Sequence, residues 1–238
     1  MITFGQGALI LVAVWLALVA FRFHRSTVVL VGGLALVALY AVLGVWRGDV
    51  TPTQLGLGGD HLTWVTPVIA LAWTGLMYAY SPVADALASR WVTQRPNLKT
   101  FRALQQSVAK LVAGIAIAWL LGGVLEELAF RGVVLTSTSV LLRPWLPEPV
   151  SVAVGVVVAA AGAGVIHLYQ GSRAVIIITQ LSVLFGLLFV VSGFNLWAVI
   201  LCHGAYDTIA FVRFARGKSK YSRLDEEAQA PSAGEAAP

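Results

Sequence analysis

The chain has 238 residues, of which 58% are hydrophobic and only 11% are charged. Soluble domains average about 25% charged residues, so this composition excludes a water-soluble domain, a disordered regulator and a nucleic-acid-binding domain, although the net charge is +5. The one cysteine, Cys202, excludes an internal disulfide and a cysteine-based metal cluster. The composition therefore predicts an all-α protein that crosses a lipid bilayer several times.

The first part of the chain contains uncharged runs long enough to cross a membrane. A bilayer core of about 30 Å requires roughly 20 apolar residues in a helix. Predicted spans are Ile2–Phe21, Ser26–Trp46 and Leu62–Ser81. A hydrophilic connection, Pro82–Lys110, follows them and carries several basic residues. It either lies on the membrane surface as a broken amphipathic helix or forms a solvated loop.

The second part of the chain completes a bundle of about seven spans. Its predicted spans are Leu111–Leu142, Val150–His167, Ala174–Val191 and Leu196–Val212. We expect three regions: N-terminal transmembrane helices with the basic connection (1–110), a core of transmembrane helices (111–212), and a tail (213–238) that is basic at first and then disordered.

The basic residues predict the orientation of the bundle. Alternating seven spans places most of the 16 Lys and Arg residues on one side. Because cytoplasmic loops carry the excess of Lys and Arg, we expect a multi-pass protein of the cell membrane with its C-terminus in the cytoplasm.

Six ionisable side chains interrupt the apolar runs of the second part. A charge at the bilayer centre costs about 2.5–3.5 kcal/mol on insertion scales, so such a group predicts a functional site within the membrane. These residues are Glu126, Glu127, Arg131, His167, His203 and Asp207.

The sequence LEELAFRG contains two acids that we expect to have different roles. Glu127 and Arg131 are four residues apart with the acid first, the favoured orientation for an ion pair within a helix. Glu126 points about 100° away from Glu127, so it cannot share that pair equally. The spacing predicts one neutralised and one available carboxylate. In the alternative interpretation, both acids only tie this helix to its neighbours through Arg131.

The two histidine motifs are each open to a structural and a functional interpretation. His203 and Asp207, in HGAYD, are four residues apart and share one helix face, where they form either a site or a polar clamp between helices. His167 ends the run AAAGAGVIH, which is rich in small residues. It is either a helix-end histidine whose ring nitrogens are hydrogen-bonded or part of a site. If the fourth predicted helix, which carries Glu126, continues past Arg131 to Leu142, all these groups lie near the middle of the membrane.

A carboxylate and two imidazoles in a water-poor cavity suit the activation of a water molecule for amide hydrolysis. Other intramembrane hydrolases fit the sequence less well. No HExxH zinc motif is present. Ser192-Gly193 lacks the frame of a rhomboid-type serine site, and Tyr206-Asp207 has no later GxGD of the presenilin type.

The order EELAFRG, then a small-residue helix ending in His167, then HGAYD, resembles the CPBP family of intramembrane endopeptidases. Its members are the bacterial and archaeal relatives of the CAAX prenyl protease type 2, and they are also called the Abi family. The resemblance covers about residues 111–212 and implies an all-helical fold with a site inside the bilayer. It implies that Glu126 activates water with His167 as its partner, and that His203 and Asp207 stabilise the oxyanion. Glu127 and Arg131 complete the first motif as supporting residues.

Two positions depart from the family pattern. Ala163 occupies the place of Phe in FxxxH, which changes the packing beside His167. Asp207 stands where Asn is frequent, and a carboxyl group donates a hydrogen bond only when it is protonated. We expect no metal cofactor, because the acids have other roles, although two histidines and two carboxylates also suit Zn²⁺.

The sequence therefore favours an intramembrane endopeptidase that acts on a peptide or membrane protein. Its expected partner is the lipid bilayer, and no nucleic acid is expected to bind. Two alternatives remain from the sequence alone. One is a non-catalytic membrane protein of the same family, such as a bacteriocin-immunity or protein-sorting factor. The other is a small proton-coupled transporter, for which we find no paired broken helices in two halves of the chain.

Overall fold

The computed structural model describes residues 3–219 and 221, and within them the protein is entirely helical, which confirms the predicted class. The rest of the predicted tail, 220 and 222–238, lies outside the described residues. The helices are α1 (Phe4–Leu18), α2 (Thr27–Trp46), α3 (Val65–Ser89), α4 (Val108–Ala118), α5 (Thr136–Leu142), α6 (Glu148–Ile166), α7 (Ser172–Val191) and α8 (Leu196–Ala215).

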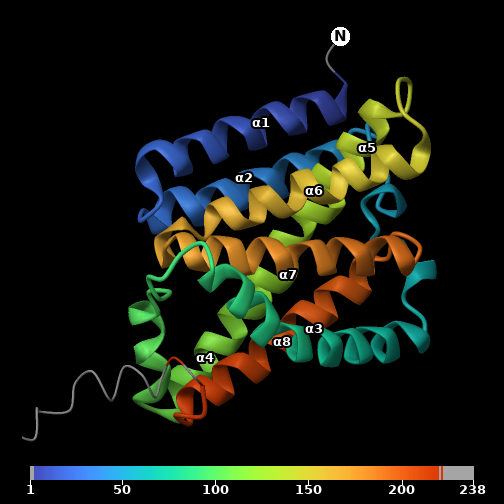
Figure 1. Cartoon of the computed structure of the whole chain (residues 1–238). Coiled ribbons are helices and arrows are strands. Elements are labelled where there is room, and N and C mark those ends of the chain that lie inside the picture. Colours follow the sequence, from blue (N-terminus) through green and yellow to red (C-terminus); the bar gives the residue numbers. More distant parts are fainter. Residues whose placement is uncertain (1–2, 220, 222–238) are drawn as a thin grey trace, which may run out of the picture.

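Six of the described helical segments are long and apolar enough to cross a membrane, so the chain is a multi-pass membrane protein. The third predicted span corresponds to α3, which is not among the six. Its sequence contains two threonines, two tyrosines, two prolines and one tryptophan, which lower its mean hydropathy. In Figure 1, α3 nevertheless runs between the same two ends of the molecule as its neighbours. The α1–α2, α3–α4 and α6–α7 connections gather at one end, and the α2–α3, α5–α6 and α7–α8 connections at the other.

The boundary predicted at Pro82 is wrong, because α3 continues through this proline to Ser89. A proline inside a membrane helix is tolerated where neighbouring side chains satisfy the freed backbone groups. Pro82 leaves the carbonyl of Tyr78, four residues earlier, without its helical N–H partner. Side chains hold the helix on either side of the proline: the Ser81 hydroxyl donates to the Met77 carbonyl at 2.9 Å, and the Gln180 amide of α7 donates to the Ala84 carbonyl at 3.3 Å. The basic connection is therefore shorter than predicted.

The connection that follows α3 packs against the end of the bundle. It contains a 3₁₀ segment, Lys99–Gln105, in which Leu104 is buried. The Phe101 ring lies 5.3 Å from the ring of Phe211 in α8, and the Gln105 amide donates to the Phe214 carbonyl at 3.2 Å. The predicted basic connection therefore docks on α8.

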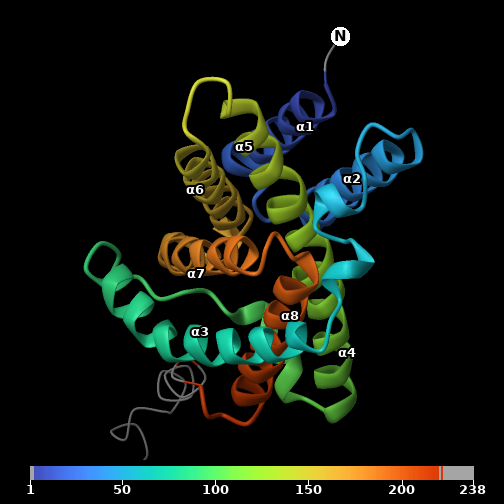
Figure 2. The ribbon, with the colours of Figure 1, turned by 90° about the vertical axis from the view of Figure 1, so that its right-hand side faces the viewer.

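One 35-residue helical segment, Val108–Leu142, forms the centre of the molecule. Figure 2 shows it running through the full height of the structure, with α8 beside its lower half. Its middle is wound as π-helix over Trp119–Glu126 and Leu128–Leu135, between α4 and α5. Such wide turns occur frequently at functional sites. The helix continues past Arg131 to Leu142, which is the condition for the ionisable groups to lie near the middle of the membrane. The EELAFRG motif lies on its π-helical part.

Close contact between this segment and α8 depends on glycine. A Cβ atom at Gly204 would lie 2.4 Å from the Trp119 ring, so no larger residue fits there. The Trp119 indole N–H donates to the Thr208 hydroxyl at 3.0 Å, one turn further along α8. These contacts fix α8 against the π-helical turn that precedes the two acids.

Candidate active site

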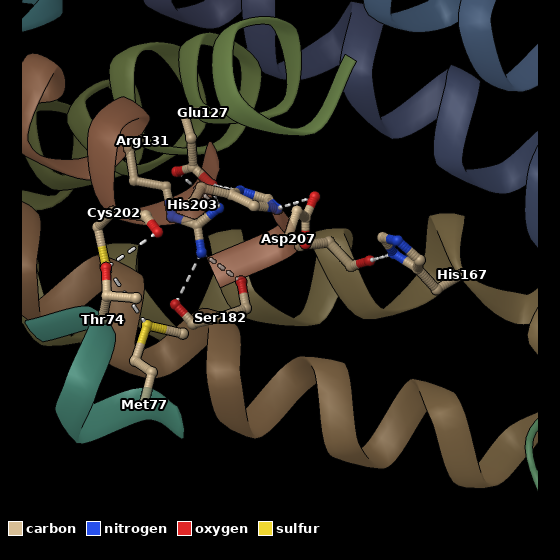
Figure 3. Close-up of polar contacts among 10 residues, drawn as sticks. Thr74, Met77, Glu127, Arg131, His167, Ser182, Cys202, His203 and Asp207 are labelled. Carbon is tan, nitrogen blue, oxygen red and sulfur yellow. Dashed lines mark hydrogen bonds and ion pairs between the residues drawn. The ribbon is translucent and has the colours of Figure 1, made fainter. Parts of the chain in front are cut away.

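The predicted ion pair between Glu127 and Arg131 is present and lies in the interior. A guanidinium nitrogen of Arg131 is 3.1 Å from both carboxylate oxygens of Glu127, and the two residues are 1% and 0% exposed. A second guanidinium nitrogen donates to the carbonyl oxygen of Ser182 at 2.8 Å and to its hydroxyl oxygen at 2.6 Å. Arg131 therefore joins the central helix to α7 (Figure 3).

Glu127 also binds His203, a contact between α8 and the central helix that sequence spacing could not supply. Nδ1 of His203 lies 2.6 Å from Oε1 of Glu127. A carboxylate can only accept, so Nδ1 carries a proton and donates it, which directs Nε2 away from Glu127. The Phe185 ring stacks on the imidazole at 4.6 Å and lies under the Arg131 guanidinium at 5.3 Å. The His203 ring is thus held at its edge and on its face.

Asp207 lies beyond His203, on the side away from Glu127. Its Oδ2 is 3.5 Å from Nε2 of His203, which agrees with their predicted shared helix face. Figure 3 shows the resulting row of side chains: Arg131 and Glu127, then the His203 ring, then Asp207. A fixed pair of polar atoms, Nε2 and Oδ2, stands at the end of this row.

Glu126 and His167 lie near this cluster without joining its hydrogen bonds. Glu126 is half-buried and close enough to interact electrostatically with Arg131, His203 and Asp207. Within the described part of the chain, no hydrogen bond or ion pair of its carboxylate is found. The structure thus agrees with the predicted division between one engaged acid and one available acid.

His167 ends α6 on the far side of Asp207 from His203 (Figure 3). Its Nδ1 lies 2.8 Å from the Ala163 carbonyl oxygen and donates to it, so Nε2 is the free nitrogen. The ring is half-buried, stacks on Tyr169 at 5.9 Å and lies within electrostatic reach of Asp207. Ala163, where the family pattern has Phe, supplies the carbonyl that orients the imidazole.

Sequence reasoning missed three residues of this region. Ser182 was detectable, because it is a polar residue in an apolar run. Phe185 gave no signal, since a phenylalanine in a membrane span is ordinary. Tyr169, which follows α6, lies within electrostatic reach of Glu126 and Asp207. Burial raises the pKa of its phenol to about 12, so it stays a neutral hydroxyl group beside the two acids.

The cluster as arranged does not present a set of metal ligands. Glu127 is engaged by Arg131 and His203. Among residues 3–219 and 221, no group of three or more His, Cys, Asp or Glu side chains is placed to hold a metal ion.

The fold and the cluster define a multi-pass membrane protein with a buried group of ionisable side chains. Residues 108–209 match the family model described as type II CAAX prenyl endopeptidase, Rce1-like. The match begins at the first residue of α4 and ends within α8, so it includes all six residues that the sequence singled out. This segment is thus a domain of the Rce1-like family, as its resemblance to the CPBP proteins predicted. No curated protein and no solved structure matches the chain.

Proposed function

We propose that this protein is an endopeptidase that hydrolyses a peptide bond inside the bilayer. The observation that carries the proposal is the buried row from Arg131 through Glu127 and His203 to Asp207, with the unengaged carboxylate of Glu126 beside it. The location of this row within a domain of a protease family supports the same assignment. A cluster that served only to hold helices together would not require a second acid without a partner.

Each of these residues has its own role in the hydrolysis. Glu126 takes a proton from a water molecule, whose oxygen attacks the carbonyl carbon of the substrate, and Nε2 of His167 orients that water. The carbonyl oxygen becomes an oxyanion, and His203 stabilises it by hydrogen bonding together with Asp207, which donates from its protonated carboxyl group. Glu126 then returns the proton to the amide nitrogen as the C–N bond breaks.

Glu127 and Arg131 have a supporting role in this scheme. The Glu127 carboxylate accepts from Nδ1 of His203 and fixes the orientation of the ring, so that Nε2 points away from Glu127 and can donate to the oxyanion when it carries a proton. Arg131 neutralises Glu127, and Ser182 holds Arg131 in place. The substrate oxygen therefore meets donors that are already oriented, which is the condition for strong electrostatic catalysis.

We propose a peptide or membrane protein as the substrate, because the site lies in the bilayer. The description of the matching family adds prenylated CAAX peptides as a class to be tested. We further propose that the end carrying the α3–α4 and α6–α7 connections and the end of α8 faces the cytoplasm, since the excess of Lys and Arg lies there.

Replacement of Glu126 by Gln tests the proposal. It removes the base and keeps the shape, so cleavage should be abolished while the protein still inserts and accumulates. Membrane proteomes of cells with wild-type protein or Glu126→Gln would be compared to find accumulating substrates. The purified proteins would be assayed on a fluorogenic farnesylated CAAX peptide and on its unprenylated form. Glu148→Gln, which changes an exposed acid at the start of α6, is the matched control and should cleave normally.

Cleavage at the wild-type rate by the Gln variant would contradict the glutamate mechanism. If the wild-type protein and the Gln variant leave the same membrane proteome and neither cleaves a peptide, the non-catalytic alternative is favoured instead.

A further inference from the structure

The two histidines of the site are held in similar ways. Nδ1 of His203 binds the Glu127 carboxylate, and the Phe185 ring stacks on the face of the imidazole at 4.6 Å. Nδ1 of His167 donates to a backbone carbonyl oxygen of α6 at 2.8 Å, and the Tyr169 ring stacks on the imidazole at 5.9 Å, with 28° between the two planes. Each imidazole thus has a hydrogen bond at its edge and an aromatic ring on its face.

The ring on the face is needed because a single hydrogen bond does not fix the plane of an imidazole. With its one bond, His167 is free to turn about the line from Nδ1 to the Ala163 carbonyl oxygen, and this rotation moves its other nitrogen, Nε2. Ala163 lies one helical turn earlier on α6, and its methyl group is too small to cover the imidazole. Aromatic rings attract one another with their centres about 4.5–7 Å apart. The Tyr169 ring lies within this range and opposes the rotation.

The contact between His167 and Tyr169 depends on where α6 ends. Residues two positions apart do not face each other on a helix. Here α6 ends at Ile166, and His167 has φ −96° and ψ 10°, a conformation that many active-site residues adopt. The 3₁₀ turn Leu168–Gln170 follows and brings the Tyr169 ring back to the imidazole.

Gln170 holds this turn in place. It is buried, its side-chain amide donates to the Tyr169 hydroxyl oxygen at 2.8 Å, and its backbone N–H donates to the His167 carbonyl oxygen at 2.9 Å. The Gln170 carbonyl oxygen accepts from the backbone N–H of Asn97 at 2.8 Å, so the connection between α3 and α4 also supports the turn. The Tyr169 ring is therefore a fixed support for His167.

We propose that Tyr169 is a positioning residue, whose ring sets the plane of the His167 imidazole so that Nε2 is directed at the water that Glu126 activates. This inference rests on the proposed function. Tyr169 acts through His167, and it exchanges no proton with the substrate. The aromatic ring carries this role, and the hydroxyl group only helps to hold the ring.

Two substitutions of Tyr169 separate the ring from the hydroxyl group. Both variants are assayed for kcat and KM on the farnesylated CAAX peptide, or on the substrate found by the membrane comparison. Tyr169→Leu removes the ring, so kcat should fall about 10–10²-fold because Nε2 is displaced, with KM changed by less than about threefold. Tyr169→Phe keeps the ring, so its kcat should stay within about threefold of wild type.

Tyr80→Leu is the matched control. Tyr80 is also half-buried, and its hydroxyl group also bonds a glutamine, since it donates to Oε1 of Gln180 at 3.0 Å. It lies in α3, and within the described residues its ring has no contact with a histidine. Tyr80→Leu should keep kcat within about threefold of wild type, while its free energy of unfolding in SDS falls about as far as that of Tyr169→Leu.

Several results would overturn the inference. One is wild-type kcat in Tyr169→Leu, and another is an equal loss of kcat in Tyr80→Leu. Equal losses in the Leu and Phe variants of Tyr169 would mean that the hydroxyl group acts, and a change in KM alone would mean that the ring binds substrate. If Tyr169→Leu does not accumulate, Tyr169→Met replaces it with the same expectation, because its flexible side chain lacks a ring and adapts to the space. Failure of the proposed function gives another pattern, in which the wild-type protein cleaves no faster than Glu126→Gln.

Discussion

Replacement of Arg131 by Ala gives the most direct test of the buried cluster. The guanidinium of Arg131 makes contacts of 2.6–3.1 Å with the Glu127 carboxylate and with Ser182. Its removal leaves the Glu127 carboxylate buried, with His203 as its remaining partner. Loss of one member of a buried ion pair costs about 3–5 kcal/mol. We expect a value near the lower end, about 3 kcal/mol, because Nδ1 of His203 still donates a hydrogen bond to the carboxylate.

The free energy of unfolding in detergent, measured by titration with SDS, checks this value. The control variant Arg143→Ala loses an ion pair with Glu148 that lies on the surface, where the Arg143 and Glu148 side chains are 48% and 67% exposed. Its free energy of unfolding should therefore fall by no more than about 1 kcal/mol. The double variant Glu127→Gln/Arg131→Ala should regain part of the stability, because no stranded charge remains. Equal stability of Arg131→Ala and wild type would refute the argument.

Three further predictions concern the chemistry and the support of the site. Asp207→Asn should keep its activity and extend it to higher pH, because an amide donates a hydrogen bond without a titrating proton, whereas Asp207→Ala should lose about 10²–10³-fold in kcat. Both results would be read from pH–rate profiles of the variants and wild type. An inactive Asn variant would mean that the carboxylate itself is required. We expect the purified protein to contain no stoichiometric zinc and to keep its activity in the presence of a chelator. Stoichiometric zinc in elemental analysis, with activity lost on chelation and restored by added metal, would contradict this expectation. Ser182→Ala should lower the free energy of unfolding by about 1.5–3 kcal/mol, the range for a hydrogen bond to a charged group, and an unchanged value would show that the Ser182 hydroxyl does not hold Arg131.

The parts of the site that could be predicted from the sequence are those that depend on spacing within one helix. The Glu127–Arg131 pair and the His203–Asp207 pair are both four residues apart, and helix geometry alone brings each pair together. The contact between Glu127 and His203 joins residues that are 76 positions apart, so it depends on how α8 packs. No local pattern contains that information.

The fold shows the same division. Hydrophobic length predicted the spans well, because the thickness of the bilayer sets a minimum that the sequence must meet. The end of α3 was missed, since Pro82 normally signals a helix end and the part of α3 beyond it is held partly by a side chain of α7. The π-helical winding around the acids was also missed, because apolar composition is the same for either kind of helix.

The length of the central helix has a consequence for how the protein responds to its membrane. A segment of 35 residues is about 50 Å long, well beyond the hydrocarbon thickness of about 30 Å, so it must tilt. A change in bilayer thickness is then accommodated by a change of tilt. Glu126 lies near the midpoint of this segment, and the middle of a tilting rod moves little. Lipids with shorter or longer acyl chains should therefore rotate the helix while the acids stay at the same depth.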